Sequence, residues 1–124
     1  SIFIHGDSLQ ASLVAVVVPA PEAFMPWARR IASLPHASIA TLCADGRIAD
    51  ALLAELAELG RSAQLQGYEI VRAVFCEPTP FDVETNGLLT TTFKLKRGVA
   101  RDYYRRQIDD MYAAISTRKP ASTK

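Results

Sequence analysis

The sequence has 124 residues, of which 49% are apolar and 22% are charged, and its net charge is +1. This length and composition fit one soluble globular domain and exclude a wholly disordered chain. No apolar run reaches the roughly 18 residues needed to span a bilayer, so no transmembrane segment is predicted. No signal peptide is visible. The sequence does not begin with methionine, as expected for an excised fragment.

Charge is unevenly distributed along the chain. Residues 1–91 carry five basic and ten acidic side chains, whereas residues 92–124 carry nine basic and three acidic ones. A basic end on an acidic body indicates an anionic partner at that end. A solvated basic helix followed by a basic tail explains the same pattern, and charge alone favours this simpler interpretation.

Side chains that could form a metal or catalytic site are sparse. Cys43 and Cys76 lack metal-ligand spacing and are interpreted as free thiols in a reducing compartment or as small core residues. His5 and His36 have no cysteine or carboxylate at ligand spacing, so they are interpreted as surface or turn histidines. There is no glycine-rich phosphate loop and no nucleophile elbow. We therefore predict no metal site and no complete catalytic site.

The first predicted elements are two strands, residues 2–5 and 13–18, joined by a turn at residues 6–8. The second strand is apolar throughout and does not alternate. This pattern predicts a strand buried on both faces, at the centre of a sheet. Pro19 and Pro21 end the strand, and Pro21 suits the first turn of a helix.

Three helical segments are predicted next. The first has four core-facing residues at helical spacing: Phe24, Trp27, Ala28 and Ile31. A short apolar helix is expected at residues 38–43. The third begins after Asp45 as N-cap, ends by Gly67, and has a core-facing stripe of four residues: Ile48, Leu52, Leu56 and Leu59.

The second half of the chain returns to the sheet and ends in a helix. Residues 70–76 predict a third strand and residues 78–88 a loop. Residues 99–115 predict a last helix, with five residues on one face: Val99, Tyr103, Ile108, Met111 and Ile115. Residues 1–116 are thus expected to form one α+β domain, with a small mixed sheet of about three strands flanked by three or four helices, and residues 117–124 a disordered tail.

The most unusual segment is residues 86–97, NGLLTTTFKLKR. If residues 93–96 are extended, alternation puts Lys94 and Lys96 on the side opposite Phe93 and Leu95. A projecting ammonium is a compact charge that suits a phosphate or carboxylate on another domain. In isolation, however, this basic run is more typical of a solvated turn.

These residues resemble the terminal motif of long-chain fatty acyl-CoA synthetases, members of the adenylate-forming (AMP-binding) superfamily. The similarity continues in other segments that occur in the family order: residues 4–10 (IHGDSLQ), 13–19 (LVAVVVP), 26–28 (PWA) and 104–112 (YRRQIDDMY). Thr91 departs from the proline usual in the family, and Ala20 from the usual acidic residue.

The resemblance implies that the chain is the C-terminal lid domain of a long-chain fatty acid–CoA ligase. In this family a fatty acid carboxylate attacks the α-phosphate of ATP, with Mg²⁺, to give acyl-AMP, and the thiol of coenzyme A then displaces AMP. The adenylation lysine corresponds to Lys94. Lys96, Arg97 and Arg101 are candidate contacts for coenzyme A or other anionic substrates, although a solubilising role explains them as well. No residue is assigned to a metal.

The resemblance also implies partners and a location. The upstream large AMP-binding domain of the same polypeptide would bind most of the ATP and Mg²⁺, so this chain alone is expected to be inactive. A cytoplasmic location is implied, where enzymes of the family usually work at membrane surfaces. The alternative is a non-catalytic interaction or regulatory module on the same fold. A nucleic-acid-binding module is disfavoured, because few exposed aromatic residues accompany the basic run.

Overall fold

The computed structural model describes residues 1–7, 10, 12–64 and 70–117. Within these residues the chain forms a three-stranded mixed sheet and five helices. The predicted α+β class and the number of strands are confirmed. The five helices exceed the predicted three or four, because the last predicted helix is two helices.

The sheet has the order β1-β2-β3, in which β1 is Ile2–Gly6, β2 is Leu13–Val17 and β3 is Val71–Cys76. β1 and β2 are antiparallel, whereas β2 and β3 are parallel. The three middle residues of β2 are at most 1% exposed. The non-alternating apolar run therefore did predict the central strand, which is covered on both faces.

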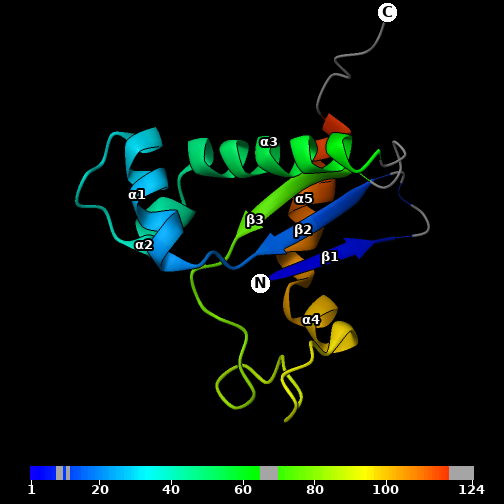
Figure 1. Cartoon of the computed structure of the whole chain (residues 1–124). Coiled ribbons are helices and arrows are strands. Elements are labelled where there is room, and N and C mark those ends of the chain that lie inside the picture. Colours follow the sequence, from blue (N-terminus) through cyan, green and yellow to red (C-terminus); the bar gives the residue numbers. More distant parts are fainter. Residues whose placement is uncertain (8–9, 11, 65–69, 118–124) are drawn as a thin grey trace, which may run out of the picture.

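Helices cover the two faces of the sheet (Figure 1). α1 (Pro21–Ala32), α2 (Ile39–Cys43) and α3 (Gly46–Ser62) form the crossover from β2 to β3, and α3 lies along β3. α4 (Arg97–Tyr103) and α5 (Arg105–Thr117) follow β3, and α5 packs on the opposite face. Two apolar clusters result, one on each face of the sheet.

Two helix starts lie at or within one residue of their predicted positions. The Ser38 hydroxyl accepts a hydrogen bond of 3.2 Å from the Thr41 amide at the start of α2. The Asp45 carboxylate accepts one of 2.9 Å from the Arg47 amide at the start of α3. Each side chain satisfies an amide that has no partner inside its helix, which explains why short polar residues mark these boundaries.

The predicted core stripe of α3 was only partly correct. Ile48 is buried and Leu52 packs beside it against α1 and α2, but Leu59, on the same side of the helix, is 65% exposed. α1 and α2 lie only beside the first part of α3 (Figure 1), so the stripe continues past its partners. The residues of α3 toward β3 are on a rotated face that includes Ala49 and Leu53.

The predicted helix over residues 99–115 is interrupted at Tyr104, which lies between α4 and α5 with φ −99° and ψ 20°. Val99 and Tyr103 were predicted to face the core, yet they are 44% and 52% exposed. Ala100 and Tyr104 are buried in their place. No glycine or proline marks the break. The sequence pattern therefore predicted one continuous helix, and the apolar face that suits α5 was assigned to the wrong residues of α4.

Smaller differences occur elsewhere. In α1, Ile31 is 37% exposed and Ala32 is buried in its place, which extends the buried face of Phe24 and Ala28 by one turn. α5 continues through Thr117, the first residue of the predicted tail. The rest of that tail and Gly67, the predicted limit of α3, lie outside the described residues. None of the described helices is both long and apolar enough to cross a bilayer.

Candidate functional site

The segment between β3 and α4 carries the candidate lysine and projects from one end of the sheet, on the side of α4 (Figure 1). Its first part is organised by Asp82. The Asp82 carboxylate accepts hydrogen bonds of 2.9 Å from the Glu84 amide and 2.8 Å from the Thr85 amide. These bonds lower the pKa of the Asp82 carboxyl, with Thr85 as the largest cause. The loop therefore has a defined shape at neutral pH, where Asp82 is charged.

Asn86 closes this part of the loop. Its side-chain oxygen accepts hydrogen bonds from the amides of Asp82 (2.9 Å) and Leu88 (3.2 Å), and its side-chain nitrogen donates to the Pro80 carbonyl (3.0 Å). Gly87 follows with φ +67°, a conformation that residues with a side chain rarely adopt. The Asn-Gly pair, at the end of the predicted loop, thus fixes the entry into the lysine segment.

Leu88 anchors the base of this segment. Its side chain is fully buried in the apolar cluster that contains Tyr104 and Ile108. Its carbonyl accepts a hydrogen bond of 2.8 Å from the Lys96 amide, and Leu89 and Leu95 form an isolated antiparallel bridge. The two arms of the segment are therefore joined to each other and to the core.

Residues 90–94 form the tip of this short hairpin. The Thr90 amide donates to the Lys94 carbonyl at 2.8 Å, and the Lys94 amide donates to the Thr90 hydroxyl at 3.0 Å. The Phe93 amide donates to the Thr90 carbonyl at 2.8 Å. These three bonds fix the backbone of Lys94 without using its side chain.

The predicted alternation fails at Phe93. This residue has φ +64° and is 75% exposed, so the segment turns at this position instead of running extended. Of Phe93 and Leu95, only Leu95 packs against the core. A non-glycine residue in the left-handed region is uncommon, and such positions are concentrated at functional sites.

The Lys94 side chain is exposed at the hairpin tip. Its ammonium makes no hydrogen bond or ion pair with any residue that the structure describes. A cation held by a fixed backbone, with its full charge available, can interact with an anion that another molecule or domain brings close. The projecting cation predicted from the sequence is thus present, although a turn presents it and not a strand.

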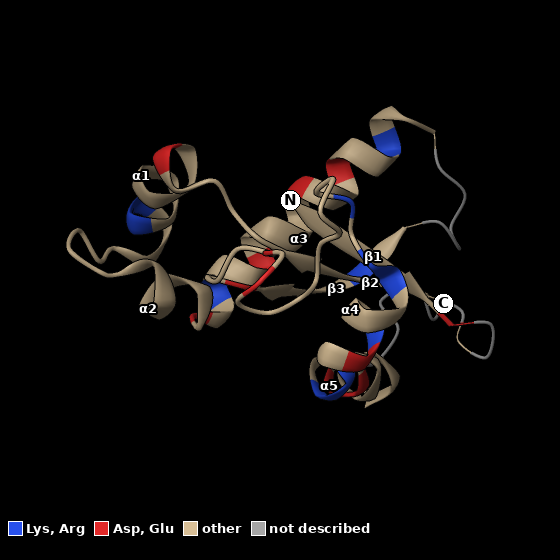
Figure 2. Ribbon diagram, turned by 90° about the horizontal axis from the view of Figure 1, so that it is seen from below, with Lys and Arg blue, Asp and Glu red and all other residues tan. Residues whose placement is uncertain are grey.

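The other predicted basic residues differ from Lys94 in their contacts. Lys96 is exposed at the N-cap of α4. Arg97 donates to the Ile4 carbonyl of β1 at 3.4 Å, and its guanidinium lies 6.0 Å from the centre of the Phe3 ring. Arg101 lies 3.6 Å from the Asp102 carboxylate. Basic segments gather around α4 beside β1, whereas acidic and basic residues mix along α5 (Figure 2).

One structural contact of the site was missed. The Tyr104 hydroxyl donates to the Glu77 carboxylate at 2.8 Å and so joins the start of the loop to the break between α4 and α5. Burial and the Glu77 contact raise the pKa of Tyr104. The sequence signal was weak, because Tyr104 stands among charged residues, Asp102, Arg105 and Arg106, and off the predicted apolar face of the last helix.

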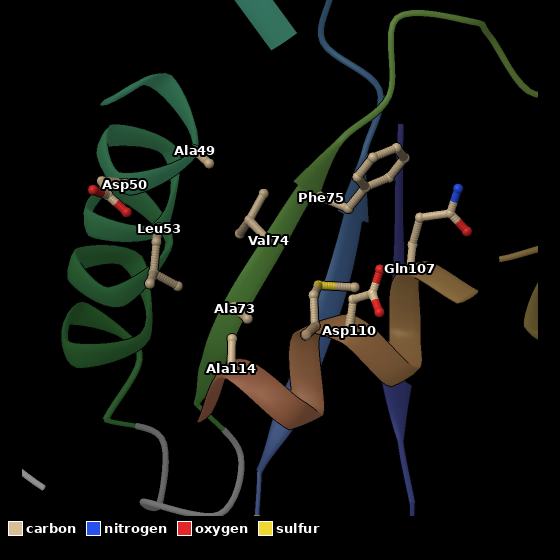
Figure 3. Close-up of a pocket in the computed structure, with 10 residues that line it drawn as sticks. Ala49, Asp50, Leu53, Ala73, Val74, Phe75, Gln107, Asp110 and Ala114 are labelled. Carbon is tan, nitrogen blue, oxygen red and sulfur yellow. The ribbon is translucent and has the colours of Figure 1, made fainter. Parts of the chain in front are cut away.

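A groove of about 320 Å³ lies at the outer edge of β3, between α3 and α5 (Figure 3). Leu53 and Val74 form one wall and Phe75 lies toward α5, with Asp50, Gln107 and Asp110 among the other lining residues. Lys94 and the other basic candidates are not among its lining residues. The hairpin and the groove are therefore separate features of the surface.

The two histidines are unlike each other. His36 is exposed, whereas His5 lies in β1, inside the predicted strand, where it is half-buried and in ring contact with Phe3 and Tyr112. Burial and the charge of Arg105 lower the pKa of His5. Across the residues that the structure describes, no three of the side chains His, Cys, Asp and Glu are grouped as a metal site would need.

Comparison with known proteins identifies the region. No protein-family model matches the chain. The chain is 45% identical over 122 residues to peroxisomal long chain acyl-CoA synthetase 7 of Arabidopsis thaliana, covering 98% of this chain and 17% of that protein. It is 40% identical over 114 residues to human long-chain-fatty-acid–CoA ligase 1, covering 92% of this chain and 16% of that protein. The chain is homologous to the C-terminal region of long-chain acyl-CoA synthetases.

Solved structures agree with this assignment to the AMP-binding superfamily. The adenylation domain of a carboxylate reductase from Mycobacterium chelonae superposes with a TM-score of 0.68 and 35% identity, covering 90% of this chain and 15% of that one. The corresponding domain from Segniliparus rugosus, in complex with AMP and a co-purified carboxylic acid, gives 0.67 and 30% identity, covering 92% and 16%. The chain thus spans about one sixth of the length of these acyl-CoA synthetase and adenylation-domain relatives.

Proposed function

We propose that this chain serves as the lid domain of a long-chain fatty acid–CoA ligase and that Lys94 is its adenylation lysine. The observation that carries the proposal is the hairpin tip. Three hydrogen bonds fix the backbone around Lys94, while its ammonium has no partner among the described residues. The reaction it serves would join a fatty acid to coenzyme A at the expense of ATP, in the cytoplasm.

The role proposed for Lys94 is electrostatic. When a carboxylate attacks the α-phosphate of ATP, both reactants are negatively charged, so a cation between them lowers their repulsion and orients them. The hairpin favours this electrostatic role, because it holds the donor in position and so keeps the free-energy cost of reorganisation small. The ammonium moves no proton in this step. It holds the attacking oxygen near phosphorus while pyrophosphate leaves.

Lys96, Arg97 and Arg101 would form a secondary anionic contact surface, for example toward the phosphates of coenzyme A. The three side chains differ in how available they are to a ligand, because their intramolecular contacts differ. The Lys96 ammonium has no partner among the described residues, whereas Arg97 is engaged with β1 and Arg101 with Asp102. Lys96 is therefore the most available of the three, and the two arginines would have to exchange their intramolecular contacts for new ones.

Mg²⁺ and most of the ATP contacts are assigned to another part of the ligase. The described residues offer no carboxylate cluster that would hold a divalent cation. When bound there, Mg²⁺ would offset charge on the phosphates of ATP. The proposed partner is the large AMP-binding domain of the same polypeptide, whose substrate would be a long-chain fatty acid.

The test is fatty-acid-dependent exchange of pyrophosphate into ATP, measured on this chain joined to its large domain. We expect Lys94→Ala to lower exchange roughly 100- to 1000-fold, the usual effect of losing one preorganised donor. Thioester formation from preformed acyl-AMP should change little. Lys96→Ala is the matched control, because it removes another exposed ammonium two residues away, and it should keep exchange within a few fold.

Several outcomes would contradict the proposal. Equal exchange in the wild type and Lys94→Ala would remove the catalytic role of Lys94 and favour the non-catalytic interaction module. An equal loss in the Lys94 and Lys96 variants would reduce the hairpin to a general basic surface. Far-UV circular dichroism of each variant checks that the fold is retained.

A further inference from the structure

The two cysteines meet across the interface between α2 and β3. Cys43 is the last residue of α2 and Cys76 the last of β3, and their Sγ atoms are 2.8 Å apart. Both are free thiols, as the sequence predicted. A disulfide bond is about 2.0 Å long, so the sulfurs need to approach by less than about 1 Å.

From this geometry we infer that Cys43 and Cys76 form an oxidative modification site that peroxide converts into an intramolecular disulfide. The inference does not depend on the proposed ligase activity. It concerns the face of the sheet covered by α1, α2 and α3, and it uses neither Lys94 nor the hairpin.

The surroundings distinguish the two thiols. Cys76 is 3% exposed, within an apolar cluster that includes Leu42 and Ile48. Cys43 is half-buried at the border of this cluster, so a small oxidant reaches it first. No third metal ligand accompanies the pair among the described residues, so these thiols are not explained as a metal site.

The chemistry balances with hydrogen peroxide as the oxidant. The Cys43 thiolate attacks one peroxide oxygen, the O–O bond breaks, and Cys43 becomes a sulfenic acid as one water is released. The Cys76 sulfur then attacks the Cys43 sulfur, the S–S bond forms, and the sulfenic oxygen leaves as a second water. Two thiols are oxidised, one peroxide is reduced, and a dithiol reductant restores both thiols.

Burial controls the speed of this reaction. Desolvation raises the pKa of both thiols, so little thiolate is present near pH 7. Oxidation should therefore be slow at neutral pH and accelerate as the pH rises. The bridge would close across 33 residues of sequence and fix α2 to β3, which reduces the freedom of the unfolded chain.

The experiment treats the reduced 124-residue protein with hydrogen peroxide, followed by intact mass and peptide mapping. We expect a monomer that loses the mass of two hydrogen atoms and yields one peptide pair linked through Cys43 and Cys76. Dithiothreitol should reverse the change. The melting temperature of the oxidised form should rise by about 10 °C, from the effect of a loop of this length.

Cys43→Ser and Cys76→Ser are the matched controls. In Cys76→Ser, peroxide should oxidise Cys43 to sulfinic or sulfonic acid, which dithiothreitol does not reduce. In Cys43→Ser, the buried Cys76 should stay reduced. The inference is overturned if the wild type keeps two free thiols after peroxide, gains oxygen without a bridge, or links two chains. These outcomes are read from the wild type, so they do not depend on how well either variant folds.

Discussion

Replacing Leu88 by alanine tests whether the base of the lysine hairpin is part of the core. Leu88 is fully buried, and its backbone joins both Asn86 and Lys96. Buried leucines shortened to alanine lose about 3–5 kcal/mol, because the transfer energy of the side chain is lost and a cavity remains. This is a large part of the roughly 5–15 kcal/mol that stabilises a domain.

Urea unfolding of Leu88→Ala, followed by far-UV circular dichroism, measures this loss. With a slope of about 2 kcal/mol per molar urea, the midpoint should fall by roughly 2 M. The control is Leu59→Ala, which removes the same atoms from a side chain that is 65% exposed and should change stability by less than about 0.5 kcal/mol. A loss below about 1 kcal/mol at Leu88, or equal losses in both variants, would refute the burial argument.

Two further substitutions test the contacts that shape the site. Tyr104→Phe removes the bond to Glu77 and should cost about 1–2 kcal/mol near pH 7 in urea unfolding. Because the fold raises the pKa of Tyr104, wild-type stability should fall as the pH rises above about 10, where the unfolded tyrosine ionises. The variant should lose part of this alkaline decline, and an unchanged pH profile would count against the contact. Gly87→Ala places a side chain at φ +67° and should lower the free energy of unfolding by about 1 kcal/mol in the same urea experiment. An unchanged free energy would contradict the strain expected at this turn.

The sheet was predictable because its signal is local. The non-alternating run in β2 predicted a strand covered on both faces, and Val14 and Val16 are indeed buried on the side of α5. The two capped helix starts were predictable for the same reason, since Ser38 and Asp45 bond amides only two or three residues away.

The errors have a common physical origin. Helical periodicity identifies an apolar face, but it does not give the length over which a partner covers that face. Leu59 continues the face of Ile48 and Leu52 beyond the helices that cover it, and it is therefore exposed. The break at Tyr104 depends on packing against Phe75 and Phe81, from segments distant in sequence, so no local pattern could reveal it.

The sequence selects a candidate residue for the site, but it does not predict the geometry around that residue. The resemblance selected Lys94, and the structure gives it an exposed position at a hairpin tip. The left-handed turn at Phe93 could not be read from the alternating pattern, because the bonds that form it begin at Thr90. The sequence also did not show that the two arginines have intramolecular partners while the Lys96 ammonium has none among the described residues. Arg97 contacts β1, and Arg101 contacts Asp102 in α4.

The parallel pairing of β2 with β3 has a consequence for how the chain assembles. β1 and β2 are neighbours in sequence and can pair early, whereas β3 joins only after the chain from Val17 to Val71 has crossed the sheet. Closing so long a segment costs entropy before its contacts form, which slows folding. Until β3 arrives, the central strand has an open edge, and this interval is when the nascent domain is most exposed to aggregation.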